Sequence, residues 1–184
     1  MQYDVVQAEN KVLRGKAAAV PVAEITSPKI QKILNTMRAT LAEYRDGVAL
    51  AAPQIGIPLR VFVVADSFFE GNEDDDVETK LKHRDTSTYS VYINPVITKT
   101  SSKKADMDEG CLSVRWVYGK TKRFEKVTIA AYNELGKKFT RGASGLLAQA
   151  FQHETDHLNG TLFIDHATDL EEVDPTKIVE EEKT

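Results

Sequence analysis

Two histidines and a glutamate in the C-terminal part of the chain lie in one short stretch with helical character. The stretch Leu146–His157 contains good helix formers and follows a predicted glycine-containing turn at Gly142–Gly145. Residues four apart lie on one face of a helix, so His153 and His157 face a common position with Glu154 beside it. Two imidazoles suit a divalent cation, and the adjacent carboxylate suits a base that deprotonates a bound water. Because the chain has only four histidines, this spacing favours a metal site over two histidines on a surface helix.

A catalytic metal site of this kind needs a third protein ligand as well as a position for water. The sequence offers His166, the acidic pair Glu171 and Glu172, and Cys111. His166 falls outside the spacing used by proteases with a third histidine and is interpreted as a surface residue. Cys111 has the stronger case, because Gly110 permits an unusual backbone turn and metal binding stabilises a thiolate. A lone cysteine is also compatible with a small buried hydrophobic residue, so a distant glutamate stays open at this point.

Length and composition define the wider class of protein. The 184 residues suit a single domain over 1–184, with 41% hydrophobic and 28% charged residues. The net charge of −4 argues against nucleic acid as a main partner, because phosphate binding needs a basic face. We find no apolar run of the roughly 20 residues that span a membrane, and no signal or transit peptide. With one cysteine, the expected location is a bacterial-type cytosol, with an organelle as the alternative.

One helix is predicted in the N-terminal part of the chain. Ser27 and Pro28 are typical of a helix start, as N-cap and first helical residue. Residues 5–22 before it have no clear period and are predicted to be extended coil. Apolar side chains then recur at helical spacing and form one stripe, which we assign to the core. The stripe consists of Ile30, Ile33, Leu34, Met37, Leu41 and Tyr44.

Strands are predicted on both sides of a polar, acidic segment. Residues 59–64 and 91–97 are rich in β-branched side chains, and the second strand is predicted to bend or end at its proline. Residues 127–132 and 138–141 flank a short glycine-containing connection and are predicted to form a hairpin that leads into the histidine helix. We therefore predict an α+β fold, with antiparallel sheets packed around the central helix, plus the N-terminal helix. The remaining polar segments are an acidic surface loop at 66–88 and an acidic tail at 169–184.

Three motifs in this order resemble those of the peptide deformylase family. They are Gly47–Gln54, Glu109–Ser113 and Gln152–His157, and the ordered trio is far more specific than any one of them. The resemblance covers most of the chain except the acidic loop and the tail. It implies a metal-dependent hydrolase that removes the formyl group from formylmethionyl N-termini of nascent polypeptides and releases formate. Lesser markers agree with it: Leu13-Arg14, Asn94-Pro95 and Arg123.

The resemblance also implies a role for each residue of the motifs. Glu154 would take the proton of a metal-bound water, so that hydroxide attacks the formyl carbon, and would return a proton to the leaving amine. The Gln54 amide and the Leu112 backbone N–H would stabilise the charge that develops on the formyl oxygen. The resemblance implies one divalent metal per chain, with Fe(II) as the favoured ion and zinc, nickel or cobalt able to replace it. Its ligands would be Cys111, His153 and His157.

A pocket for the substrate is expected on the same face of the histidine helix. Leu146, Gln149 and Ala150 precede His153 by seven, four and three residues, so they project toward its side of the helix. The resemblance identifies the side chain that they receive as methionine. The expected substrate-binding residues are Gly47, Val48, Ala49, Glu109, Gly110, Leu146, Gln149 and Ala150.

The sequence departs from the family pattern at three places that border this pocket. Gln149 replaces an apolar residue, Ala49 replaces a second glycine, and Arg115-Trp116 replaces a frequent Pro-Gly pair. A zinc endopeptidase with a distant glutamate ligand is one alternative, and a metal-binding homologue that lost activity through Ala49 is another. The acidic tail does not support a basic helix for docking on ribosomal RNA, so the expected partners are formylated peptides and nascent chains.

Overall fold

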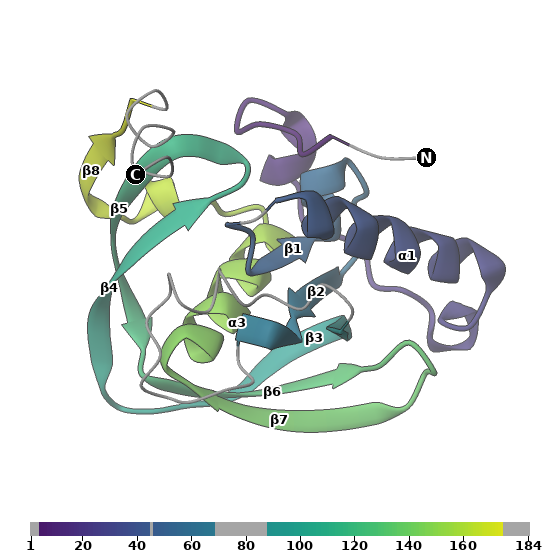
Figure 1. The fold of residues 1–184 in the computed structure, drawn as a ribbon. Helices are drawn as coiled ribbons and strands as arrows, with labels where there is room; N and C mark the ends of the chain where they lie inside the picture. Colours follow the sequence, from purple (N-terminus) through teal and green to yellow (C-terminus); the bar gives the residue numbers. More distant parts are fainter. Residues whose placement is uncertain (1–3, 45, 69–87, 175–184) are drawn as a thin grey trace.

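The computed structural model describes residues 4–44, 46–68 and 88–174, which form two antiparallel sheets and two α-helices (Figure 1). The predicted α+β class is therefore confirmed. Most of the acidic loop predicted at 66–88, and the end of the tail predicted at 169–184, lie outside the described residues. The helices and strands are α1 (Pro28–Glu43), β1 (Ala49–Ala51), β2 (Val61–Ala65), β3 (Tyr89–Thr100), β4 (Lys104–Cys111), β5 (Val114–Phe124), β6 (Lys126–Tyr132), β7 (Lys138–Ser144), α3 (Gly145–Leu158) and β8 (Thr168–Glu172), with 3₁₀ turns η1 (Lys11–Arg14), η2 (Val22–Glu24), η3 (Ala52–Ile55), η4 (Asp66–Phe68) and η5 (Phe163–Asp165).

The larger sheet has the strand order β1-β2-β3-β6-β7, and every neighbouring pair is antiparallel. The strands predicted at 59–64 and 91–97 correspond to β2 and β3, and the predicted hairpin corresponds to β6 and β7. The register of β3 against β6 shifts between Ile93 and Val96, which marks a bend near the proline. The strand then continues to Thr100. Asn94 has a φ of 52° at this bend, and its side chain exchanges two hydrogen bonds with the backbone of Val20.

The smaller sheet has the order β4-β5-β8 and was not predicted from the sequence. Among the described residues, β4 is an edge strand, and its exposed face carries charged side chains. Its sequence therefore lacks the clear alternation of apolar and polar residues that would identify a strand. All five residues of β8 are exposed. Residues 169–172 of the predicted acidic tail form most of this strand, which is held by backbone pairing to β5 rather than by burial.

The N-terminal helix forms for the reasons that the sequence predicts. The Ser27 hydroxyl accepts a hydrogen bond from the backbone N–H of Ile30, and Pro28 occupies the first turn. The apolar stripe of α1 is buried against β1 and β2. The segment 5–22 differs from the predicted extended coil, because η1 begins there at a side-chain cap from Asn10.

Helix α3 lies between the two sheets and contacts strands of both (Figure 1). The predicted turn at Gly142–Gly145 is wrong, because β7 continues through Ser144 and α3 begins at the next residue. Beneath the helix, the ring of Phe151 packs on Phe62 and Tyr92, with centroid distances of 6.1 and 4.9 Å. These buried rings fix the side of α3 that faces the core, and therefore also the side that carries the two histidines.

The C-terminal end of α3 lies where the sequence Leu158-Asn159-Gly160 predicts a helix stop. The helix ends at Leu158, and Gly160 has a φ of 81°, a conformation that glycine adopts without a steric penalty. A Cβ atom at this position would lie 2.7 Å from the backbone oxygen of Arg14. The stop therefore also allows the N-terminal segment to pass close to the helix end.

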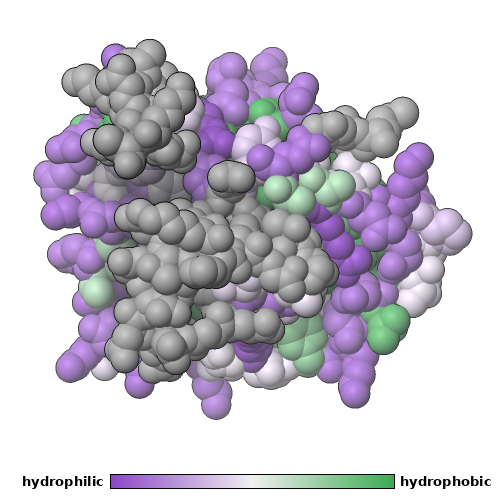
Figure 2. All heavy atoms as spheres, viewed as in Figure 1, coloured by the Kyte–Doolittle hydropathy of each residue, from purple (hydrophilic) through white to green (hydrophobic). Residues whose placement is uncertain are grey.

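On the face shown in Figure 2, hydrophobic residues form small separate areas among hydrophilic ones. In the part of the chain that the structure describes, we find no helix that is both long and apolar enough to cross a membrane.

Candidate metal centre and pocket

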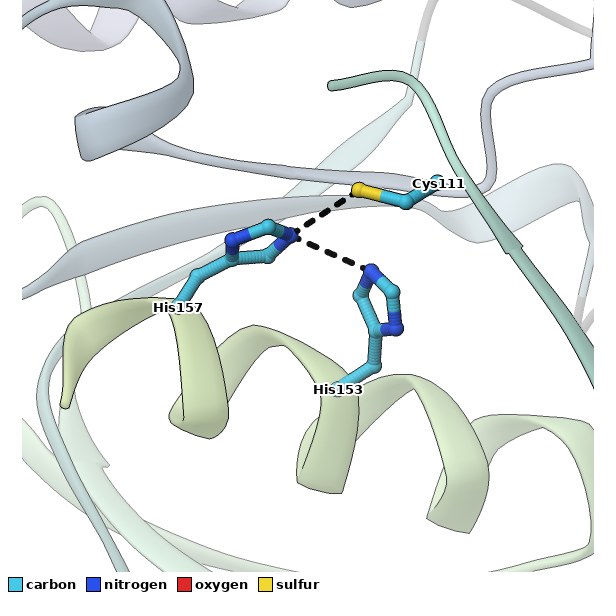
Figure 3. A group of neighbouring side chains, drawn as sticks. All are labelled: Cys111, His153 and His157. Carbon is cyan, nitrogen blue, oxygen red and sulfur yellow. Dashed lines mark hydrogen bonds between the residues drawn. The ribbon is translucent and has the colours of Figure 1, made fainter. Parts of the chain in front are cut away.

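Three potential metal ligands converge from two elements that lie far apart in the sequence (Figure 3). His153 and His157 project from successive turns of α3, and their Nε2 atoms are 3.2 Å apart. The Sγ atom of Cys111, at the end of β4, lies 3.2 Å from Nε2 of His157. All three ligand atoms lie within 4.8 Å of one another, which suits coordination of a single cation.

Two hydrogen-bond donors are directed at the sulfur of Cys111. The register of β4 against β5 shifts at Cys111, and the backbone N–H of Ser113 points to Sγ at 3.4 Å. The side-chain amide of Gln54 donates toward the same sulfur at 3.6 Å. These contacts fix the position of the sulfur beside the two imidazoles. The donor set of one sulfur and two imidazoles therefore fits a borderline-soft divalent cation such as iron, zinc, nickel or cobalt.

Gly110 precedes the cysteine for a reason other than the one predicted from the sequence. Its φ is not positive, so no unusual turn is present there. A Cβ atom at Gly110 would instead lie 2.8 Å from two ring atoms of Tyr118 on the paired strand. The missing side chain thus allows the tyrosine ring to cover the backbone next to the ligand.

His153 is oriented by a buried carboxylate. Its Nδ1 lies 2.6 Å from Oε1 of Glu109, which is 5% exposed. The guanidinium of Arg123 donates to both oxygens of Glu109, at 2.6 and 3.0 Å, and bonds Asp156 on α3 at 2.6 Å. Although burial by itself raises the pKa of Glu109, the bonds from His153 and Arg123 hold it far below its usual range. The carboxylate is therefore ionised and fixes the imidazole, leaving Nε2 directed at the other ligands.

Glu154 points into the site without a hydrogen-bond partner on one of its oxygens. The residue is 3% exposed, and its Oε2 atom is buried and unpaired among the described residues. Burial raises the pKa of Glu154 to about 7, and the electrostatic interaction with His153 opposes part of this shift. Burial likewise lowers the pKa of His157, which favours the neutral imidazole that a metal ligand requires. An unpaired buried carboxylate beside three ligand atoms is the arrangement expected where a small polar molecule binds.

Gln54 is held rigidly beside the cysteine by η3. Its side-chain oxygen accepts the backbone N–H of Ala51 at 2.8 Å, and its nitrogen also donates to Ser113 at 3.3 Å. The residue is 1% exposed. Its amide N–H groups therefore face the cysteine side of the site, in an orientation that these bonds fix.

A pocket of about 230 Å³ opens above these residues. Of the predicted site residues, only His157 does not border it, and this side chain is buried. Ala49 borders the pocket and also belongs to the core around Phe62. The lining residues that the sequence predicted are Gly47, Val48, Ala49, Gln54, Glu109, Gly110, Cys111, Leu112, Leu146, Gln149, Ala150, His153 and Glu154.

Several pocket and network residues were not predicted as functional. Arg123 was noted only as a family marker, and Thr121, whose hydroxyl bonds Glu109 at 2.5 Å, was not noted at all. Their spacing of two residues places both on one face of a strand, but this signal requires β5 to be assigned first. The additional lining residues are Asp46, Asp108, Val114, Arg115, Trp116, Val117 and Tyr118.

The other candidate ligands lie away from the cluster. Glu171 and Glu172 are exposed on β8, opposite Tyr118 and Val117 of β5. His166 is exposed, and its Nε2 lies 3.9 Å from Asp156. Among the described residues, the geometry therefore favours the thiol over a distant glutamate as the third ligand.

The fold and the site suit a class of protein in which one thiol and two imidazoles at the base of a pocket could hold a single metal ion. The family model for polypeptide deformylase matches residues 2–173. The peptide deformylase of Carboxydothermus hydrogenoformans is 42% identical over 168 residues, covering 91% of this chain and 95% of that protein. Peptide deformylase 1A of Arabidopsis thaliana, chloroplastic/mitochondrial, is 38% identical, covering 88% of this chain and 60% of that protein.

Solved structures agree with these matches. A peptide deformylase from Acinetobacter baumannii with Met-Ala-Ser bound has a TM-score of 0.76 and 31% identity, covering 90% of this chain and 98% of that one. A peptide deformylase from Synechococcus elongatus in complex with actinonin has a TM-score of 0.75 and 33% identity, covering 91% and 81%. The chain belongs to the polypeptide deformylase family, and it is a metal-dependent hydrolase that removes the formyl group from nascent peptides.

Proposed function

We propose that Glu154, Gln54 and Leu112 carry out deformylation at a divalent cation held by Cys111, His153 and His157. The observation that carries this proposal is the convergence of one thiol and two imidazoles beside the buried, unpaired oxygen of Glu154. When bound, the cation would lower the pKa of a water molecule and polarise the formyl group. The resemblance favours Fe(II) as that cation, and the donor set is also compatible with zinc, nickel or cobalt.

Glu154 is proposed to move the proton. Its pKa of about 7 is well matched to both accepting and returning a proton near neutral pH. Its buried position keeps the carboxylate out of bulk water, so the proton passes to the leaving α-amine rather than to solvent. General acid–base catalysis of this type contributes roughly 10²–10⁴-fold to a rate.

Gln54 and Leu112 are proposed to stabilise the negative charge on the former formyl oxygen. The Gln54 amide is already oriented by its bond to Ala51, so it does not need to reorganise during the reaction. Leu112 follows the metal ligand Cys111 directly and borders the pocket, where its backbone N–H is the second donor implied by the resemblance. Loss of one such donor costs about 3–4 kcal/mol in other enzymes.

The formylated methionine is proposed to place its side chain in the pocket. Val48, Leu146 and Ala150 provide apolar walls, while the Gln149 amide is turned aside to donate to the backbone oxygen of Asp108 at 2.8 Å. The carboxylate of Glu109 is saturated by its bonds to other side chains. We therefore assign Glu109 to orienting His153 rather than to binding substrate directly.

The proposed substrates are formylmethionyl peptides and nascent chains that carry them. A relative that binds Met-Ala-Ser, the deformylated form of such a peptide, supports this choice. Nascent chains emerge where ribosomes work, so we propose the cytosol as the location. The site residues, the pocket and both sheets would act together as one catalytic domain.

The test is formate release from formyl-Met-Ala-Ser by protein purified without oxygen, with metal analysis of the same sample. The parent protein is expected to release formate with about one metal per chain, most of it iron. Glu154→Gln is expected to keep its metal and lose roughly 10²–10⁴-fold in kcat, whereas Glu125→Gln, at an exposed position, serves as the matched control.

Three other outcomes would contradict the proposal. Cleavage of internal peptide bonds, with Cys111→Ala retaining its metal, would indicate a zinc endopeptidase with another third ligand. Bound metal without formate release from the parent protein would indicate a non-catalytic homologue. Full turnover by Glu154→Gln would show that this carboxylate is not the base.

A further inference from the structure

The pocket has a buried inner end and an open outer end. Near the metal ligands, Gln54, Glu109 and Glu154 are at most 5% exposed. At the other end, the side chains of Arg115 and Asp46 are 24% and 50% exposed. A peptide whose formylated residue reaches the inner end must therefore continue outward past the residues of the open end. Trp116 lies there and lines the pocket.

Trp116 has an unfavourable backbone conformation. Its φ is 66°, in the left-handed region where a side chain approaches the following carbonyl oxygen. Asn94 and Asp169 are the other non-glycine residues with positive φ in the described part of the chain, and both are types that tolerate this conformation. The short polar side chains of Asn and Asp can form local hydrogen bonds that offset this cost, whereas the bulky Trp116 side chain cannot. Strain of this kind is found preferentially at sites of binding and catalysis.

The tryptophan ring is held in place by a neutralised ion pair. The Arg115 guanidinium carbon lies 5.3 Å from the ring centroid of Trp116 and 5.1 Å from that of Tyr44. Its two terminal nitrogens bond the carboxylate of Asp46, at 2.5 and 3.4 Å. Arg115 and Asp46 neutralise each other, so this pair adds no net charge beside the aromatic surface of Trp116.

We propose that Trp116 binds the side chain of the second substrate residue, the one after formylmethionine, and selects apolar or aromatic residues there. This inference rests on the proposed function. The formylated residue fills the inner end, so the next residue is the first to reach the indole. An aromatic face gains most from contact with apolar or aromatic groups, and the paired Arg115 and Asp46 give no compensating advantage to charged ones.

The first test compares formyl-Met-Leu-Ser with formyl-Met-Gly-Ser, using the ratio of their kcat/KM values within each protein. The parent protein is expected to prefer the leucine peptide by roughly 5- to 10-fold, the size of one aromatic contact. Trp116→Asn, which removes the ring but tolerates the same φ, is expected to lower this ratio below about 2-fold. Asp169→Gly relieves a positive φ away from the inner pocket and is expected to keep the parent ratio.

The second test needs no turnover, because Trp116 is the only tryptophan in the chain. Its fluorescence is expected to change more on titration with Met-Leu-Ser than with Met-Gly-Ser. If both formylated peptides released formate with equal kcat/KM, or if Met-Leu-Ser and Met-Gly-Ser changed the fluorescence equally, the role of Trp116 would be overturned. Either result would leave the proposed deformylation intact. A leucine-dependent fluorescence change without any formate release would support peptide binding at Trp116 and overturn the proposed catalysis.

Discussion

Replacement of Glu109 by glutamine tests whether the buried ion pairs support both the fold and the metal site. The substitution keeps the size of the side chain but places an amide NH₂ where Arg123 and His153 donate to a carboxylate. The Glu109 and Arg123 side chains are 3% and 7% exposed, so solvent screens their attraction weakly. Two donors would then face each other in the protein interior, and Arg123 would lose one of its two carboxylate partners.

The expected cost can be worked out from this geometry. Removing one partner of a buried ion pair costs about 3–5 kcal/mol, and the lower end applies here because Arg123 keeps its bond to Asp156 at 2.6 Å. This is a large part of the roughly 5–15 kcal/mol that stabilises a typical domain. A loss of about 3 kcal/mol corresponds to a fall of roughly 1–3 M in the urea midpoint. The measurement is urea unfolding followed by circular dichroism.

The metal site should weaken in the same variant. His153 loses the carboxylate that fixes its ring at 2.6 Å, and loss of such a partner typically costs 10- to 100-fold in metal affinity, or about 1.4–2.7 kcal/mol. Competition with a chelator for cobalt measures this change. Glu125→Gln is the control, since this exposed glutamate should alter stability by no more than about 0.5 kcal/mol. The reasoning would be refuted if the free energy of unfolding of Glu109→Gln lay within about 0.5 kcal/mol of the parent value and its cobalt affinity fell by less than about 10-fold.

Two further predictions concern the fold and its pH dependence. Gly47→Ala places a Cβ atom 2.7 Å from buried Leu41 and should cost about 1–3 kcal/mol in urea unfolding, whereas Gly142→Ala meets nothing within 4 Å and should be neutral or slightly stabilising. Equal stability of the two variants would contradict the packing argument. Although burial raises the pKa of Asp165, a backbone N–H and an arginine lower it more. Its stabilising effect is therefore full above its unfolded pKa and is lost as the pH falls through the lowered folded pKa. The difference in free energy of unfolding between the parent and Asp165→Asn should shrink as the pH is lowered from about 6 to about 3; a constant difference would contradict this assignment.

The sequence predicted those elements whose local signals agree with their environment. α1 has a capping serine, a proline in its first turn and an apolar stripe, and the structure places all three as expected. The end of α3 was predicted from Gly160, and the β6–β7 hairpin from its glycine-containing connection. In each case the residues that define the element also determine where it begins or ends.

The smaller sheet escaped prediction because its strands are stabilised mainly by backbone pairing. β4 and β8 place charged residues on their exposed faces, so their sequences have the composition of loops. The residues that meet in the cluster and around the pocket could be named from the sequence, because each of the three motifs is a short continuous stretch. The network of Glu109, Arg123 and Asp156 was not, since its members come from β4, β5 and α3 and meet only after the smaller sheet has formed.

The origin of the three ligands on two separate elements couples cation binding to the mechanics of the molecule. Cys111 terminates β4 of the smaller sheet, whereas both histidines belong to the helix that packs on the larger sheet. A cation bound by all three would link β4 to that helix. At a free metal concentration 1,000 times the dissociation constant, this link would add about 4 kcal/mol to stability. Chelation should therefore allow the edge strand β4 to separate first, and amide hydrogen exchange should rise there before it rises in the larger sheet.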